Sequence, residues 1–285
     1  MHQVSKRGYL HENYRLFHSS DRRDVDFEIH SHDFHKIVLC LSGRVTYIVE
    51  GVTYFLRPWD VLIIPEHQIH RSIMHSAETY ERMVLWISDA YLCSFGEQAL
   101  LDVFIWPLSL QCALFRPDAQ KRGQLIDKLR EVERNWHAGF EGHLLLADTY
   151  LLQFLLELGR QLKTGPLLAQ PSVQSDPLMQ RVLDHINSHL GEDLSVEALA
   201  GICFLSPSRL MHRFREHTGC TVHQYVLQKR LMQAASLIQA GEGISRAAQQ
   251  AGFADYSAFL RAFRRQYGCL PREMKKDADF FEKQG

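Results

Sequence analysis

Apolar residues in the first third of the chain come in short runs separated by turn residues. Residues 24–88 contain three such runs, "HKIVLCLSG", "RVTYIVEGVTYFLRPWDVLIIP" and "YERMVLWIS", which are rich in Val, Ile, Leu, Tyr and Phe. Turn residues at Gly43, Gly51 and Pro58–Asp60 interrupt these runs, and two apolar strands on either side of Glu50–Gly51 indicate a tight hairpin. Short antiparallel strands at this spacing predict a β-sandwich or a small β-barrel.

The pattern changes to a helical period after about residue 89. Residues 119–163 contain two helical segments, "AQKRGQLIDKLREVERNW" and "HLLLADTYLLQFLLELGRQL". The second segment is apolar over more than one stripe, so it must be covered on more than one side. Its own domain and a partner helix in a dimer are both possible coverings, and the sequence leaves the two open. The apolar positions at helical spacing are Leu144, Ala147, Leu151, Phe154, Leu155 and Leu158.

A change of composition divides the chain near residue 170. The segment "TGPLLAQPSVQSDP" has three prolines and no Lys or Arg, which is typical of an interdomain linker. Everything beyond residue 178 has a helical pattern, with predicted N-caps at Ser195, Ser206 and Asp255. We therefore predict a domain at 1–163, a linker at 164–176 and a helical domain at 177–285.

The helical domain contains an internal repeat. The stretch "LSPSRLMHRFREHTGCTVHQYV" resembles "ADYSAFLRAFRRQYGCLPREM", and each is part of a short helix, a tight turn and a second, basic helix. Matching residues of the two copies lie 49 positions apart after the turn and 48 positions apart before it, so one turn is a residue longer. The plan is that of a helix-turn-helix motif, whose second helix enters the DNA major groove. The matching pairs are Ser208 and Ser257, Leu210 and Phe259, Phe214 and Phe263, Gly219 and Gly268, and Cys220 and Cys269.

These two copies resemble the DNA-binding domain of the AraC/XylS family of bacterial transcription regulators. The resemblance covers residues 177–276, and residues 24–88 are similar to the cupin-like sensor that such regulators often carry. It implies an α+β multidomain protein: an N-terminal cupin-like β-barrel with dimerisation helices, and a C-terminal all-α domain with two helix-turn-helix motifs. It also implies two major-groove helices joined by a stiff helix and reading DNA segments about 34 Å apart.

The outward positions of the two copies are the candidate DNA contacts. The family places an Arg that reaches base edges two positions before the second-helix Phe, and Arg261 holds that position in the second copy. The first copy has His212 there, a departure that leaves base reading by this copy in doubt. Met211 could contact a thymine methyl group, whereas Arg215, Arg264 and Arg265 are expected at phosphates. The remaining candidates are Ser208, Arg209, Tyr256, Ser257 and Leu260.

Two histidine clusters, "EIHSHDFHK" and "PEHQIHRS", lie in the strand region. Alternation along an extended chain puts His30, His32 and Lys36 on one side, with Val38, Tyr47, Trp59 and His70 expected nearby. These side chains suit a polar effector, such as a sugar or an anionic metabolite, or a three-His metal site made by His30, His32 and His70, and a purely structural role for the histidines is the third alternative. Metal-binding cupins have a Glu where this chain has Lys36, and a cation is a poor substitute for that ligand.

Charge distribution separates the two parts of the chain. Residues 208–276 carry 12 Lys or Arg against 4 Asp or Glu, whereas residues 1–164 carry 18 against 21. This asymmetry favours a polyanion as the partner of the C-terminal part. The six cysteines form no CxxC pair, and neither a secretory signal nor an apolar run of membrane-spanning length is present, so we expect a cytoplasmic protein without a metal or other cofactor.

The sequence thus predicts a non-enzymatic, ligand-responsive transcription regulator, with regulation of sugar or related carbon catabolism suggested by family analogy. Expected partners are double-stranded promoter DNA, a small-molecule effector, RNA polymerase and a second copy of the chain, but no membrane. One alternative is a cupin metalloenzyme of the isomerase or dioxygenase type with an appended helical domain. A third possibility is a constitutive DNA-binding protein whose filled barrel serves only to dimerise.

Overall fold

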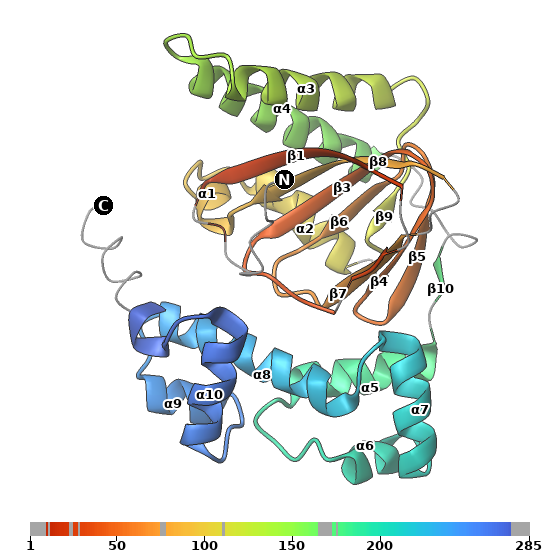
Figure 1. Cartoon of the computed structure of the whole chain (residues 1–285), viewed down its shortest axis with the longest axis vertical. Coiled ribbons are helices and arrows are strands. Elements are labelled where there is room, and N and C mark those ends of the chain that lie inside the picture. The colour runs from red at the N-terminus through yellow and green to blue at the C-terminus, as the bar shows by residue number, and fades with distance from the viewer. Residues whose placement is uncertain are drawn as a thin grey trace. The chain divides into compact units, whose positions relative to one another are not determined.

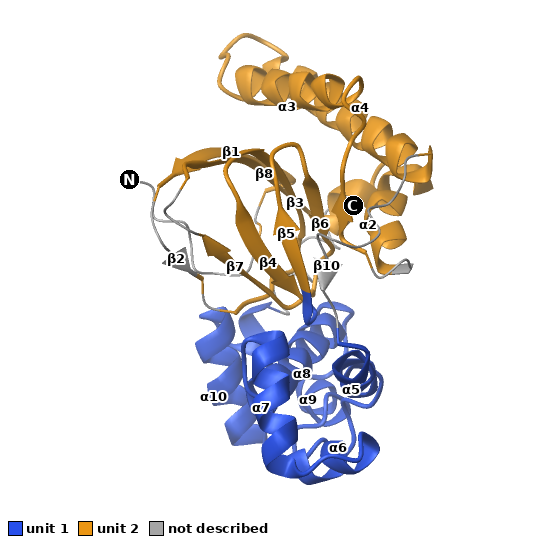
Figure 2. Cartoon of the chain, turned by 90° about the vertical axis from the view of Figure 1, so that its right-hand side faces the viewer, with its two compact units in different colours: residues 1–8, 50–52, 175–285 blue, residues 9–49, 53–174 orange. Residues whose placement is uncertain are grey.

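The computed structural model describes residues 10, 12–22, 25–27, 29–74, 78–109, 112–164, 173–174 and 176–274. The chain forms two compact units, one of residues 9–49 and 53–174 and the other of residues 1–8, 50–52 and 175–285 (Figure 2). Residues 165–172 and 175, most of the predicted linker, lie outside the described residues, as do both ends of the chain.

The strands of the first unit form two five-stranded antiparallel sheets (Figure 1). The first sheet has the order β1 (Tyr14–Asp21), β8 (Tyr80–Ile87), β3 (His35–Ser42), β6 (Val61–Ile64) and β9 (Leu114–Phe115). The second has the order β10 (Val173–Gln174), β5 (Val52–Leu56), β4 (Val45–Val49), β7 (His70–Met74) and β2 (Val25–Asp26). The predicted hairpin joins β4 to β5, and Glu50 and Gly51 both have positive φ, as a type I′ turn requires.

The described part of this unit also contains the helices α1 (Asp89–Cys93), α2 (Gln98–Ser109), α3 (Arg122–Trp136) and α4 (His143–Thr164). The predicted helices of residues 119–163 are α3 and α4, whereas β1, α1 and α2 were not among the predicted elements. Alternate residues of the first sheet, such as Ile37, Leu39 and Ile63, join Leu129 and Leu151 of the helices in one buried apolar core. Figure 1 shows α3 and α4 along the outer side of this sheet.

The other face of the first sheet is turned toward the second sheet. Cross-strand pairing places Lys36 opposite Trp86 and Val38 opposite Val84, so these four side chains share one face. On the second sheet, Tyr47 pairs with Ser72 and Val49 with His70. The Nζ atom of Lys36 lies 3.4 Å from Nε2 of His70, so the inner faces of the two sheets meet here. Polar side chains from both sheets, Lys36 on the first and Ser72 and His70 on the second, thus lie among valines on this inner face.

The second unit is helical. Its elements are α5 (Pro177–Ser188), α6 (Val196–Ile202), α7 (Pro207–Thr218), α8 (Val222–Gln239), α9 (Ile244–Gln250) and α10 (Tyr256–Tyr267). Side-chain oxygens of Ser195, Ser206 and Asp255 accept backbone N–H groups at the starts of α6, α7 and α10, as predicted. Gly219 and Gly268 end α7 and α10 in the left-handed conformation, which glycine adopts without strain.

Two helix-turn-helix motifs, α6–α7 and α9–α10, lie at opposite ends of α8 (Figure 1). Leu210 and Phe214 of α7, and Phe259 and Phe263 of α10, are fully buried, so the matched residues of the repeat are core residues in both motifs. The 18 residues of α8 span about 27 Å at the ordinary helical rise. None of the helices in the described part of the chain has the length and apolar character needed to cross a membrane.

Candidate functional site

The outward face of α7 carries the residues predicted to contact DNA in the first motif. Ser208, Arg209, Met211, His212 and Arg215 are all exposed. The Ser206 hydroxyl accepts the Arg209 N–H at 3.3 Å, so the helix begins at Pro207 and its first turn is free to approach a ligand. A buried Leu and Phe on the opposite face hold the helix in its motif.

The corresponding face of α10 carries the predicted contacts of the second motif. Tyr256, Ser257, Arg261, Arg264 and Arg265 are exposed, and Leu260 is partly buried. Asp255 accepts the Ser257 N–H at 2.8 Å and so fixes the start of the helix. The structure therefore presents the exposed candidates on one side of α10 and the buried phenylalanines on the other.

The two outward faces differ in charge. In α7 the His212 Nε2 lies 3.2 Å from an oxygen of Glu216, one turn along the helix. Arg265 holds the position matching Glu216 in α10, which has no acidic residue of its own. The guanidinium of Arg261 lies 3.9 Å from a carboxylate oxygen of Asp255, at the edge of ion-pair range. The face of α10 is therefore the better suited to a phosphate backbone.

In the first unit, the structure brings together side chains from both histidine clusters. His30 and His70 exchange backbone hydrogen bonds at 2.9 and 3.0 Å, and their rings lie 4.4 Å apart. The ring of His32 lies 4.8 Å from that of His70 and stacks on Phe34 at 3.9 Å. The Lys36 ammonium lies 5.7 Å from the centre of the Tyr47 ring. The five predicted ligand-binding residues thus form one cluster.

His35 points away from this cluster, as the alternation predicted. Its Nε2 lies 3.1 Å from Asp89 and its ring stacks on Phe104. Within the described ranges, no group of three or more His, Cys, Asp or Glu side chains is arranged to hold a metal ion. The Lys36 amine contacts His70. The group beside the three predicted histidine ligands is therefore a cation rather than the carboxylate of a metal-binding cupin.

The expected place of Trp59 was wrong. Trp59 packs on the apolar core between the first sheet and the helices, and the guanidinium of Arg122 lies 4.8 Å from its ring centre. Trp59 lies in a turn with φ of 78°, so strand alternation does not apply to it.

Sequence reasoning missed three polar residues of the inner face, namely Ser72, Tyr80 and Arg82. Arg82 pairs with Asp21 at 2.8 Å and lies over the Tyr80 ring at 4.6 Å, while Ser72 faces inward beside Tyr47. The signal was present in the period-two pattern of the strands that contain them, since Ser72 follows His70 by two positions and Tyr80 precedes Arg82 by two.

Comparison with protein families decides the class of the chain. A family model described as "AraC-like ligand binding domain" matches residues 14–93, and one described as "Helix-turn-helix domain" matches residues 199–277. Together the two matches cover more than half of the chain. The chain belongs to the AraC family of transcriptional regulators. It is accordingly a ligand-responsive, DNA-binding regulator. The ligand-binding model matches the histidine-containing β domain, and the helix-turn-helix model matches the domain with the two motifs.

Curated relatives extend over most of this regulator. It is 26% identical over 262 residues to the HTH-type transcriptional activator RhaS of Enterobacter sp. (strain 638), with 89% of each chain covered. It is 25% identical over 259 residues to RhaS of Salmonella heidelberg (strain SL476), again with 89% of each covered. Among solved structures, ToxT from Vibrio cholerae is similar at 15% identity and a TM-score of 0.37, covering 93% of this chain and 98% of that one.

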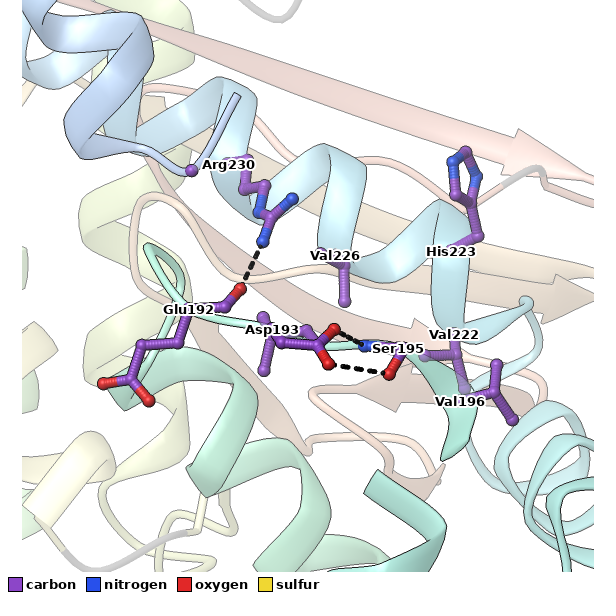
Figure 3. Close-up of a pocket in the computed structure, with 10 residues that line it drawn as sticks. Glu192, Asp193, Ser195, Val196, Val222, His223, Val226 and Arg230 are labelled. Carbon is purple, nitrogen blue, oxygen red and sulfur yellow. Dashed lines mark hydrogen bonds between the residues drawn. The ribbon is translucent and has the colours of Figure 1, made fainter. Parts of the chain in front are cut away.

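A separate hollow of about 370 Å³ lies in the DNA-binding unit of the regulator (Figure 3). Several of its polar groups are engaged in local structure: Arg230 donates to the carbonyl of Glu192 at 2.8 Å, and Asp193 accepts the N–H and the hydroxyl of Ser195. Because these bonds hold the loop before α6, we assign the hollow no ligand. The residues that line it are Glu192, Asp193, Leu194, Ser195, Val196, Val222, His223, Val226, Arg230 and Gly252.

Proposed function

We propose that this AraC-family regulator grips promoter DNA with α7 and α10 as a homodimer and activates transcription by RNA polymerase when a sugar-derived effector binds its β domain. The observation that carries the DNA part is the pair of exposed polar faces at the two ends of one helix about 27 Å long. That length suits two successive major-groove segments on one side of a duplex.

Within this proposal the exposed side chains have different roles. Arg261 reads a guanine, because its planar guanidinium can donate to O6 and N7 at once. Arg215, Arg264 and Arg265 hold phosphates and supply affinity without sequence information. Met211 contacts a thymine methyl group, since a thioether has no strong hydrogen bond to offer. His212 contributes less, because its ring is already paired with Glu216.

The effector site of the proposal is the inner cluster of the β domain. His30, His32, Lys36, Tyr47 and His70 lie together there. Imidazole and ammonium groups suit hydroxyl and anionic oxygens, and an aromatic ring suits the apolar face of a sugar. Binding would regulate the protein only if the effector favours one of two arrangements of the domains.

Dimerisation and activation rest on separate support. Leu144, Leu145, Leu146 and Leu156 of α4 are exposed, which suits burial against a second copy of this helix. The curated relatives are named transcriptional activators, which supports activation through RNA polymerase.

Selection from random duplex DNA followed by footprinting of the full chain would test this function. We expect one enriched motif in which each chain protects two major-groove segments about 34 Å apart. A chain that bound selected and random duplexes equally would contradict sequence-specific regulation. A single protected segment would contradict the use of both motifs.

A further inference from the structure

The ammonium group of Lys36 has no acidic partner within the described part of the chain. Its Nζ donates to His70 Nε2 at 3.4 Å and lies 5.7 Å from the Tyr47 ring centre, and these two contacts are both with neutral groups. The neighbouring Arg82, in contrast, has a carboxylate of Asp21 at 2.8 Å. A cation inside a protein is ordinarily paired with an anion, so the surroundings of Lys36 suit the binding of an anionic ligand.

The ionisation of Lys36 is consistent with such a role. Burial lowers the pKa of Lys36 to about 8, with a smaller contribution from the nearby Arg82. A group with this pKa is still mostly protonated at neutral pH, so the inner face keeps an uncompensated positive charge. Binding of an anion would offset the repulsion from Arg82 and give Lys36 a partner of opposite charge.

The neighbouring histidines are hydrogen-bond acceptors at this site. Nδ1 of His32 lies 2.6 Å from the Phe34 carbonyl, and Nδ1 of His70 lies 2.9 Å from the Gln68 carbonyl. A carbonyl can only accept, so each Nδ1 carries the proton. Burial, followed by the nearby Lys36, lowers the pKa of both rings well below the usual range, so both are neutral and each Nε2 is an acceptor.

One of these acceptors has no partner among the residues that the structure describes. His70 Nε2 receives the Lys36 amine, but His32 Nε2 is buried with no hydrogen bond to any described residue, and His32 is only 6% exposed. A buried polar atom without a partner calls for an explanation, and a bound ligand is one. The His32 and His70 rings lie 4.8 Å apart, so one small molecule can reach both His32 Nε2 and the Lys36 ammonium.

We infer that the effector is a hydroxylated organic acid, such as a sugar acid, whose carboxylate pairs with Lys36 and whose hydroxyl group donates to His32 Nε2. This inference rests on the proposed function and narrows its effector class. A neutral sugar would leave Lys36 unpaired, and an acid without hydroxyl groups would leave His32 unpaired. The one positive charge of Lys36 matches the single charge of a carboxylate better than the greater charge of a phosphate ester.

Calorimetric binding to the full-length chain, with matched compounds, tests the inference. The probes are glucose, gluconate, glucuronate and glucose 6-phosphate, the same four forms of galactose, and hexanoate as an acid without hydroxyl groups. We expect at least one sugar acid to bind at least about 10-fold more tightly than its neutral sugar, its phosphate ester and hexanoate, as loss of a charged hydrogen bond predicts.

Variants assign the two contacts. Lys36→Met should weaken sugar-acid binding about 10- to 150-fold, the effect of losing a hydrogen bond to a charged group, and Lys36→Arg should restore part of it. His32→Phe keeps the stacking on Phe34 and should reduce the preference for the sugar acid over hexanoate. Lys128→Met, which removes the same charge from α3, should bind like the wild type, and circular dichroism would confirm that each variant is folded.

Each other result overturns the inference. Equal binding of the sugar acid to the wild type and Lys36→Met, a preference for the phosphate ester, equal binding of hexanoate, or no binding by any sugar acid would do so. A neutral sugar that altered the DNA footprint would refute the acid while leaving the proposed function intact. Loss of sequence-specific DNA binding in every condition would instead refute the proposed function.

Discussion

Arg261 and His212 occupy matching positions of the two motifs, yet their surroundings differ. His212 is close enough to Glu216 for an ion pair, whereas Arg261 lies at the limit of reach from Asp255. Both side chains are more than two-thirds exposed, so neither pair contributes much to stability. Under the proposed function the difference concerns recognition, since of these two side chains only Arg261 has a pair of parallel donors that can bind a guanine.

Arg261→Ala is expected to weaken binding to the selected DNA site by about 1–3 kcal/mol and to relax base preference at one position. Fluorescence anisotropy on specific and random duplexes at fixed salt would measure both effects. Arg264→Ala should weaken the two kinds of binding equally, and Arg181→Ala on α5 serves as the control for loss of charge. Equal losses for Arg261→Ala on both duplexes would make Arg261 a phosphate contact.

Glu66 gives a prediction about pH. Burial, with Asp89 and Asp33 adding repulsion, raises the pKa of Glu66 from 4.5 to about 7. The folded chain therefore holds this proton more tightly than the unfolded chain, and its contribution to stability falls as pH rises from about 4.5 through 7. Glu66→Gln should gain stability relative to the wild type over that range.

The expected gain for Glu66→Gln by pH 8 is about 1–2 kcal/mol, less than the full shift implies because the Glu66 side chain is 30% exposed. Urea denaturation of both chains at pH 5 and pH 8 would measure it. A stability difference that did not change between the two pH values would show that Glu66 ionises alike in the folded and unfolded chains.

At the scale of elements, the turns of the two motifs place different residues, Phe204 and Gly252, in the same left-handed conformation. Phe204 follows α6 with φ of 54°, and Gly252 follows α9 with φ of 86°. The next N–H bonds back to Ala200 in the first motif and to Ala248 in the second, so both turns have the same form. Phe204 is 94% exposed, so its strained backbone is not compensated by packing.

Phe204→Gly should therefore stabilise the first motif by about 0.5–1 kcal/mol, the relief of left-handed strain less the added freedom of glycine in the unfolded chain. Gly252→Ala should destabilise the second motif by about 2 kcal/mol or more, because an added Cβ would lie 2.2 Å from the Leu190 carbonyl oxygen. Amide hydrogen exchange of peptides from α6–α7 and α9–α10 in the full chain would report each effect. Destabilisation by Phe204→Gly would mean that the aromatic ring contributes a contact to the fold.

Features that depend on nearby residues in the sequence could be predicted, whereas features that depend on distant segments could not. Starts of helices at Ser195, Ser206 and Asp255 were predictable, because a cap depends on residues within three positions of it. The repeat further distinguished core from outward positions, since one helix face must be buried in both copies. Strand β1 and helices α1 and α2 escaped prediction, because their stability comes from pairing and packing with distant segments.

The candidate effector site was predictable only in part. His30, His32 and Lys36 share a side through alternation, and the structure places them beside His70. The contribution of Arg82 depends on the pairing of β8 with β3, which the sequence does not reveal. Trp59 was misplaced because a turn, rather than a strand, positions it.

At the scale of the whole molecule, the exposed face of α4 is the surface on which the proposed homodimer depends. Leu145 is 69% exposed and Leu156 is 45% exposed. Eleven residues are almost a whole number of helical turns, so the two side chains lie on one stripe. The opposite stripe, with Leu151 and Leu158, is already buried in the core of the domain. The sequence left open whether α4 is covered by its own domain or by a partner, and in the structure its own domain covers one stripe while the second stripe is exposed.

Leu145→Glu is expected to raise the dissociation constant of the homodimer by 10-fold or more, because a charge would enter an apolar contact between two copies of α4. Sedimentation equilibrium of the full chain would measure it, and Phe95→Glu, at an exposed apolar residue outside α4, is the matched control. The same variant should weaken binding to a duplex carrying two half-sites while leaving binding to one half-site unchanged, since only the former needs two chains. A wild-type chain that remained monomeric at all concentrations, or a Leu145→Glu dimer as tight as the wild type, would contradict pairing through α4.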